Sequence, residues 1–392
     1  MRLAPLLACT LVIACGPGPS LTTGDSTGST TAATDSAATD TATPTGDVPP
    51  SDWTEQPDEC GGLYGLVILA DGDVVAVGGL LEPIQQISLP WAVRYTADGV
   101  LVWSEVFTEQ APIGVLAAAV LVDDDIIAVG TRDSATPLLL RLTTSGDVVW
   151  STSGVPADGS LLAAAWSPTA ATLWTTGTAA STLLVARHDA AGALVDTLPV
   201  PGGSPTVGFA IAALPDGAVV CGRAAAGEGG RLWLARYAVD GTTAWTAVGP
   251  DPGVGAFSDC WDVAAWPDGS TISVEAGFLG SRVARVDPLG ALAWEYEQPN
   301  AGAQAVDIVD DLVVVAGWSA SDESRSHATG DRHGWLRRFD RTTGGPPEHT
   351  WLGVAHVSPR DVKVHPAGGA IIVGQRISES ACEAPWIGRY AY

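Results

Sequence analysis

Short apolar runs that end in turn residues recur along the chain from position 51 onwards. Residues 66–70 lead into Asp71-Gly72, and residues 263–266 lead into Pro267-Asp268-Gly269. Asp-Gly between two apolar segments favours a tight β-hairpin, because both residues tolerate positive φ. A second apolar run follows each turn and usually ends in Gly. The pattern therefore predicts pairs of short strands, repeated many times.

A second pattern places an Arg and a Trp nine residues apart on either side of another turn. The pairs are Arg94 with Trp103, Arg141 with Trp150, Arg236 with Trp245, and Arg285 with Trp294. Three further copies are imperfect: Arg187 meets Asp196, Arg338 reaches Trp351 after a small insertion, and Arg389 lies at the C-terminal end. We interpret the Trp residues as wedges between sheets, and the Arg residues as packed stems that bond carbonyls or acids. A ring of ligand-binding arginines is the alternative.

The two patterns together give four short strands per repeat, with a period of roughly 45–50 residues, which is typical of a β-propeller blade. The sequence predicts an all-β fold, a seven-bladed β-propeller of four-stranded blades over residues 51–392. The last repeat stops after its third strand, at Arg389. The segment around Trp53 resembles an outer strand, so we expect it to complete the seventh blade and close the ring without free sheet edges.

The N-terminus is typical of an export signal. Residues 3–14 form an apolar run that is too short to span a bilayer, and it ends in Val12-Ile13-Ala14-Cys15. This ending resembles a bacterial lipobox; a competing match at Cys9 would leave too short an apolar region. The resemblance implies that residues 1–14 are a lipoprotein signal peptide and that Cys15 carries the lipid. An ordinary secretory signal with an incidental Cys is the alternative. Gly16 follows Cys15, which favours the outer membrane.

The composition of residues 15–50 predicts a disordered tether. Apart from the N-terminal Cys15 they consist almost entirely of Gly, Pro, Ser, Thr, Ala and Asp. Such a segment cannot bury enough apolar surface to offset the entropy of ordering. We expect it to hold the propeller away from the membrane.

The charge balance excludes one class of partner. The formal net charge is -25, and the chain has a single lysine, Lys363. An acidic surface repels nucleic acid phosphates, so we expect no nucleic acid partner. We expect a monomer whose surface acidity provides solubility.

Four cysteines besides Cys15 remain in the mature chain, and an exported protein meets an oxidising compartment. Their places in the repeats predict two disulfides, Cys221 with Cys260 and Cys60 with Cys382. A zinc site is the rival interpretation, although the spacing does not resemble one.

Two groups of residues are candidate ligand sites. Asp262, Asp307 and Asp361 fall early in the inner strands of three consecutive blades, which predicts an acidic arc at the mouth of a central channel. Such an arc could recruit a divalent cation or a cationic group of a partner; alternatively each Asp caps backbone or pairs with an Arg. A weaker metal candidate is a loop with His327, Asp331 and His333, for which a solvated loop is the alternative. No other cofactor is predicted.

The phrase aliphatic-x-Arg-aromatic-Asp-x-x-Gly-x-x-x-Trp resembles the repeats of bacterial lipoprotein propellers related to the quinoprotein-like family. The resemblance covers residues 52–392. It implies a lipid-anchored envelope scaffold that binds a protein or a glycan. One alternative is a docking lipoprotein similar to the propeller of the outer-membrane assembly machinery. Another is a quinoprotein-like or polysaccharide-cleaving enzyme; the sequence favours a protein without catalysis.

Overall fold

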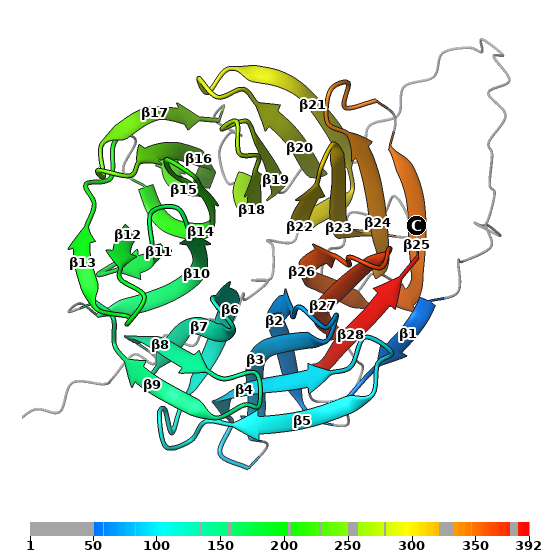
Figure 1. Ribbon diagram of the computed structural model, residues 1–392. Coiled ribbons are helices and arrows are strands. Elements are labelled where there is room, and N and C mark those ends of the chain that lie inside the picture. The colour runs from blue at the N-terminus through cyan, green and yellow to red at the C-terminus, as the bar shows by residue number, and fades with distance from the viewer. Residues whose placement is uncertain are drawn as a thin grey trace, which may run out of the picture. The chain divides into compact units, whose positions relative to one another are not determined.

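The computed structural model describes residues 51–57, 59–82, 84–133, 135–155, 158–202, 205–226, 229–249, 258–277, 280–320, 332–345, 347–376 and 383–391. These residues form 28 strands in seven sheets of four, all antiparallel, and none of them is helical. Figure 1 shows the sheets arranged as blades around one axis. The predicted seven-bladed β-propeller is confirmed. The predicted signal peptide, Cys15 and the tether lie outside the described residues.

The blades follow one another in chain order, each from its inner to its outer strand. Blade one is β2 (Gly61–Ile68), β3 (Val74–Glu82), β4 (Ile87–Tyr95) and β5 (Leu101–Val106). Blade two is β6 (Gly114–Val122), β7 (Asp125–Arg132), β8 (Thr136–Leu142) and β9 (Val148–Thr152). Blade three is β10 (Gly159–Ser167), β11 (Thr172–Ala179), β12 (Thr182–His188) and β13 (Leu194–Thr197). Blade four is β14 (Pro205–Leu214), β15 (Gly217–Ala226), β16 (Gly229–Ala238) and β17 (Thr243–Val248).

The remaining blades complete the ring. Blade five is β18 (Ser258–Ala265), β19 (Thr271–Gly277), β20 (Gly280–Val286) and β21 (Leu292–Pro299). Blade six is β22 (Ala301–Val309), β23 (Leu312–Ala320), β24 (Arg332–Asp340) and β25 (Glu348–Ala355). Blade seven is β26 (Val357–Val364), β27 (Ala370–Arg376) and β28 (Ala384–Tyr390), with β1 (Ser51–Glu55) as its outer strand.

The N-terminal strand closes the ring as the sequence predicted. β1 pairs antiparallel with β28, and Trp53 lies opposite Arg389. In Figure 1 the blue β1 lies beside the red β28. A ring closed in this way leaves no blade incomplete, so the two ends of the propeller stabilise each other.

The core lies between the blades. Second strands bury most of their residues: β3 buries six of nine, and the side chains of Val75 and Val77 are 0 % exposed. Outer strands such as β5 remain mostly exposed. This gradient arises because a middle strand packs against neighbouring blades on both faces, whereas an outer strand borders solvent.

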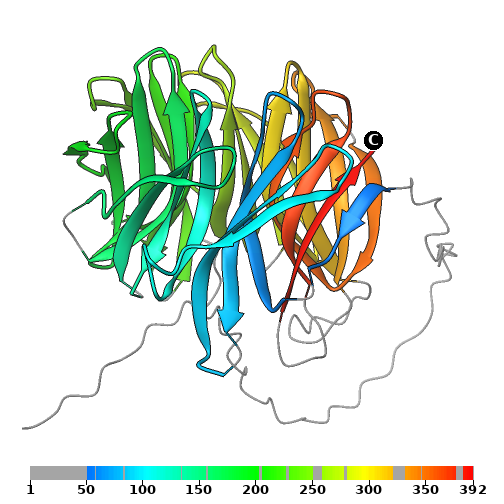
Figure 2. The same ribbon diagram turned by 60° about the horizontal axis from the view of Figure 1, so that its bottom comes forward.

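The antiparallel strands define two faces of the propeller, which Figure 2 shows from the side. We call the face with the tight hairpins, between the first and second and the third and fourth strands, the turn face. The opposite face, with the connections between blades and between the second and third strands, is the loop face. The described part of the chain offers no helix that could serve as a membrane span.

Candidate functional site

The repeated Arg and Trp residues on the turn face bind the next blade. Arg94 lies opposite Trp103, and both donate hydrogen bonds to the carbonyl of Thr144, at 2.9 and 3.0 Å. Thr144 belongs to the turn between β8 and β9 of the following blade. Arg236 and Trp245 share the carbonyl of Pro288 in the same way. These side chains hold neighbouring blades together, as the structural interpretation of the repeat proposed.

Acidic side chains support most of these arginines. Arg94 pairs with Asp71 and Asp73, Arg141 with Asp125, and Arg236 with Asp216. Asp123 and Asp124 form the turn between β6 and β7, while Asp125 at the start of β7 pairs with Arg141. On the turn face, the repeated Arg and Trp side chains are therefore occupied in contacts between blades.

Two blades replace the Trp by an acid. Asp196 lies opposite Arg187 and forms an ion pair with it, and Glu348 lies opposite Arg338 and does the same. The expectation that Trp351 fills the repeat position in blade six is therefore wrong. The turn after β24 is one residue longer than in other blades, which places Glu348 opposite the Arg. Trp351 instead lies opposite Trp335.

The three predicted aspartates each bond the inner strand of the next blade. Asp262 accepts a hydrogen bond from the backbone N–H of Val306 at 2.8 Å, and Asp307 accepts one from Val364 at 2.7 Å. Asp361 accepts one from Leu66 at 2.9 Å, across the closure of the ring. Asp262 and Asp361 also accept the N–H of the residue that follows them. The carboxylates thus link blades five, six, seven and one in sequence.

Lys363, the single lysine of the chain, lies among these aspartates. Its Nζ is 3.2 Å from Asp361 Oδ1, and the Lys363 side chain keeps 35 % exposure. Burial acts to lower the pKa of Lys363, but the charges of Asp361, Asp307 and Asp262 outweigh it and raise that pKa. The acidic arc therefore contains a cation of its own.

Burial also shifts the pKa values of the carboxyl groups, which it raises. Burial raises the pKa of Asp262 to about 7, although Lys363 opposes the shift. Burial likewise raises the pKa of Asp307. Asp262, beside the lysine, can therefore take up and release a proton near neutral pH.

A β-bulge in every inner strand fixes the register of the blades. The bulges place Gly65, Ala118, Ala163, Ala210, Asp262, Ala305 and Asp361 at equivalent positions. Asp307 lies two residues further along its strand, so its equivalent in blade seven is Lys363 and not Asp361. This offset explains why Lys363 sits between the carboxylates of its own and the preceding blade.

The residue before each of these positions was missed by sequence reasoning. Five of the seven carry large aromatic or polar side chains: Tyr64, Phe209, Trp261, Gln304 and Arg360. All but Gln304 are partly exposed, and they lie near the middle of the inner strands, in the half nearer the loop face. Reading the sequence one residue earlier in each aligned repeat would have found them. We call these five residues the mouth residues.

The mouth residues contact one another across blade boundaries. The rings of Phe209 and Trp261 stack with centroids 5.2 Å apart, and the guanidinium of Arg223 lies 5.6 Å from the Phe209 ring. Arg223 also forms an ion pair with the buried carboxylate of Asp259. Between blades seven and one, the guanidinium of Arg360 lies 6.0 Å from the Tyr64 ring.

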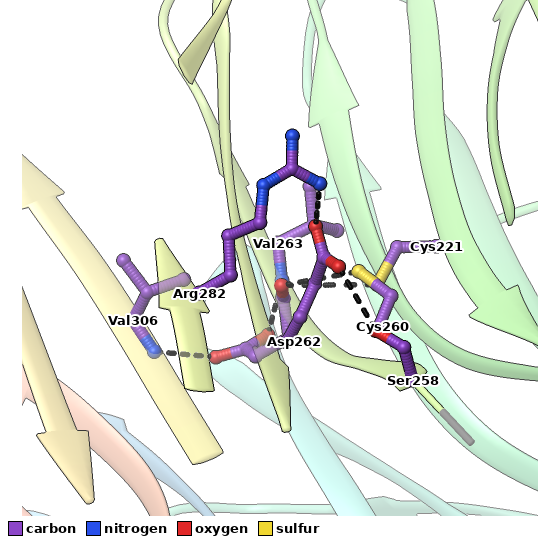
Figure 3. Close-up of a disulfide and its surroundings, with 8 residues drawn as sticks. Cys221, Ser258, Cys260, Asp262, Val263, Arg282 and Val306 are labelled. Atoms are coloured by element: carbon purple, nitrogen blue, oxygen red, sulfur yellow. Dashed lines mark hydrogen bonds and ion pairs between the residues drawn. A yellow bond between two sulfur atoms is a disulfide. The ribbon is translucent and has the colours of Figure 1, made fainter. Parts of the chain in front are cut away.

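The predicted disulfide between Cys221 and Cys260 is present beside this region. Figure 3 shows it next to Asp262, with Arg282 and Ser258 nearby. Both sulfur atoms lie 3.7 Å from the carbonyl oxygen of Asp262. The disulfide joins β15 to β18 and so fixes blade five, with its Asp262, against blade four.

The second predicted pair, Cys60 with Cys382, cannot be placed in full because Cys382 lies outside the described residues. Their neighbours do meet: the N–H of Gly61 donates to the carbonyl of Glu383 at 2.8 Å. This contact supports the pairing, which stays a prediction.

The weaker metal candidate is only partly described. His327 and Asp331 lie outside the described residues. His333 is in β24, with its ring edge-on to Trp351 at 6.2 Å. Among the described residues, no group of three or more His, Cys, Asp or Glu side chains is arranged to hold a metal ion.

Comparison with known proteins agrees on the fold. No protein family model matches the sequence. No curated protein matches it either. Among solved structures, the Dos1 propeller aligns over 87 % of this chain and 94 % of its own, with a TM-score of 0.55 and 9 % identity. Sqt1 of Chaetomium thermophilum aligns over 88 % and 98 %, with a TM-score of 0.56 and 13 % identity. Sqt1 bound to the N-terminus of the ribosomal protein L10 aligns over 85 % of this chain and 97 % of its own, with a TM-score of 0.55 and 12 % identity. Identities this low establish a shared propeller fold.

Proposed function

We propose that this protein is a lipid-anchored binding scaffold of the cell envelope, and that it takes a protein partner on its loop face. The observation that carries the proposal is the contrast between the two faces. The turn face uses its Arg and Trp side chains to join blades, whereas the loop face presents Tyr64, Phe209, Trp261 and Arg360 partly exposed around the axis.

Residues of these types suit a protein interface. Tyr, Trp and Arg are enriched among the side chains that contribute most to binding, because they combine large contact area with polar ends. Here they stand on inner strands that the bulges, the disulfide and the aspartate links hold in place. A rigid platform loses little conformational entropy when a partner binds.

The likeness to Sqt1 is consistent with a protein partner. That propeller is known bound to the N-terminus of the ribosomal protein L10. A ring of comparable extent can therefore receive a polypeptide end. Because the two chains share only 12 % identity, the chemistry of the partner of this protein has to be argued from its own surface residues.

The envelope address rests on the N-terminal sequence. The apolar run of residues 3–14 followed by Cys15 supports a lipid anchor, and Gly16 supports the outer membrane. Residues 16–50 would give the propeller its reach from the membrane. Replacement of Cys15 by Ser should move the protein from the membrane fraction to the soluble fraction; retention in the membrane would refute the anchor.

A pull-down from its own envelope tests the scaffold. The tagged wild type should capture a protein after crosslinking, and Trp261→Ala or Tyr64→Ala should reduce capture several-fold. The matched control is Leu289→Ala, because Leu289 is 84 % exposed on the turn face and should leave capture unchanged. Equal capture by all variants would place the interface elsewhere, and protease shaving of intact cells would show which side of the membrane the propeller faces.

A further inference from the structure

Blade six carries an arginine at a position that is small or aliphatic in every other blade. Arg337 is 7 % exposed and precedes the repeat arginine Arg338 on β24. The residues that precede the repeat arginine in the other blades are Val93, Leu140, Ala186, Ala235, Ala284 and Gly388. The fold therefore needs no charge at this position, and the repeat does not account for the one in blade six.

The guanidinium of Arg337 has no carboxylate partner among the described residues. Its Nε–H donates to Nδ1 of His349 at 3.0 Å, and its Nη1 donates to the hydroxyl oxygen of Tyr296, in blade five, at 3.1 Å. The His349 ring is neutral, because an imidazole nitrogen that accepts a hydrogen bond carries no proton. The rings of Trp335 and Tyr296 lie 4.8 and 5.5 Å from the guanidinium carbon. They offset only part of the cost of burying a charge, which native proteins usually meet with an opposite charge.

One edge of this guanidinium faces an exposed side chain. A guanidinium is planar, so an N–H of Nη2 leaves the same edge as Nε–H. That edge faces His349, because Nε–H donates to it, and Nη2 has no acceptor among the described residues. His349 is exposed on the outer strand β25, whereas Arg337 is buried. An outward turn of the His349 ring would therefore uncover two parallel donors and free a place the size of an imidazole.

These donors suit a carboxylate of a small organic acid. Parallel N–H groups of a guanidinium match the spacing of the two carboxylate oxygens. One negative charge balances the one cation, whereas a dianion would add excess charge to a chain whose formal net charge is -25. Apolar surface for the body of the acid lies next to the site, since the partly exposed ring of Trp351 is 4.4 Å from that of His349.

We propose that Arg337 anchors a binding site for a small organic monocarboxylate, which displaces the His349 ring and accepts from Nε and Nη2. In the free protein, Nδ1 of His349 stands in for one carboxylate oxygen. The site lies between the outer strands of blades five and six. It is therefore separate from the mouth residues and does not depend on the proposed function.

Benzoate and its neutral analogue benzamide test the ligand class with the purified full-length protein at neutral pH. Saturation-transfer NMR should detect benzoate and not benzamide, and benzoate should shift the ring-proton signals of His349 as the ring turns outward. Phosphate and sulfate are the tetrahedral oxyanions for comparison, at an ionic strength held constant with chloride. Tighter binding of either than of benzoate would overturn the assignment to a carboxylate.

Variants locate the binding. Arg337→Leu should weaken benzoate about tenfold or more, as expected for the loss of charged hydrogen bonds. It should fold, because the other blades carry small or aliphatic residues at this position. His349→Ala removes the group that competes for the guanidinium and should tighten benzoate several-fold, so it decides the question if Arg337→Leu does not fold. Arg338→Leu is the matched control, because Arg338 pairs with Glu348 and its loss should leave benzoate binding unchanged.

Three results would refute the site. They are equal signals from benzoate and benzamide, benzoate binding that persists unchanged in Arg337→Leu, and binding that His349→Ala does not tighten. Each would leave Arg337 as a structural cation held by its aromatic neighbours.

Discussion

Trp53 and Arg389 donate hydrogen bonds to the same carbonyl oxygen, that of Ala97, at 3.0 and 3.3 Å. The two donors lie near opposite ends of the chain, and their acceptor belongs to the turn between β4 and β5 of blade one. Trp103 and Arg94 hold Thr144 of the next blade with the same geometry. The closure of the ring is therefore built like an ordinary contact between blades.

The first prediction concerns this closure. Trp53→Ala should lower the free energy of unfolding by about 2–3 kcal/mol, somewhat less than for a fully buried Trp, because Trp53 is only partly buried. Urea denaturation measures the loss. Trp103→Ala is the matched control and should cost a similar amount. A negligible loss for Trp53→Ala beside a large one for Trp103→Ala would mean that the ring does not depend on its N-terminal strand.

The second prediction concerns the lysine among the carboxylates. Lys363→Met should destabilise the protein by about 1–3 kcal/mol at pH 7.5, between the values for exposed and buried ion pairs, since one third of the side chain is exposed. The loss should shrink at pH 5, where protonation of Asp262 relieves the uncompensated charge.

The same variant tests whether the arc can take a metal ion. Because Lys363 already supplies a positive charge, calcium or magnesium should change the melting temperature of the wild type little. In Lys363→Met the carboxylates of Asp262, Asp307 and Asp361 no longer face a positive charge. A bound calcium or magnesium ion should supply that charge and raise the melting temperature. A large rise in the wild type, removed by chelator, would show instead that the arc binds a metal beside the lysine.

The third prediction is a pH dependence. The pKa of Asp262 is raised to about 7 in the folded protein, whereas an unfolded Asp titrates near 4. The folded state therefore holds an extra proton between about pH 4 and pH 7, and this contribution to stability is lost as pH rises through that window. Asp262→Asn removes the contribution.

The measurement compares the two proteins across that window. The difference in unfolding free energy between wild type and Asp262→Asn should change steadily from pH 4 to pH 7 and level off above it. Asp216→Asn serves as control, because the Asp216 side chain is 69 % exposed. A difference that stays constant with pH would show that Asp262 titrates normally.

The fourth prediction concerns the disulfide. Cys221 and Cys260 are 39 residues apart, and a cross-link that closes a loop of this length is worth about 3–4 kcal/mol in the chain-entropy model. The double variant Cys221→Ser, Cys260→Ser should lose about that amount in denaturant. Asp262 lies against the disulfide, so the pH dependence described above should also weaken. A double variant as stable as the wild type would show that blades four and five need no covalent link.

The sequence alone determined the architecture. The Asp-Gly turns, the repeated Arg and Trp and the unfinished last repeat specified seven blades and their closure, because each is a local signal of a period-two strand or a hairpin. The sequence analysis also placed Asp262 and Asp361 at similar positions in their inner strands, and the strand pairing agrees. Cys221 and Cys260 could be paired because the blade order placed them in adjacent blades, on β15 and β18.

The tertiary structure decided what the side chains do. The inner-strand pairing placed Ala305, and not Asp307, at the position of Asp262 and Asp361, and an extra turn residue put Glu348 in the place expected for Trp351. The sequence showed the insertion before Trp351, but it did not show which residue would face Arg338. Lys363 lies among carboxylates of blades five, six and seven because the inner strands of consecutive blades lie side by side around the axis. Tyr64 lies near Arg360 because the closed ring brings the first and last blades together. Contacts between residues so distant in the chain depend on the closed geometry, which no local pattern encodes.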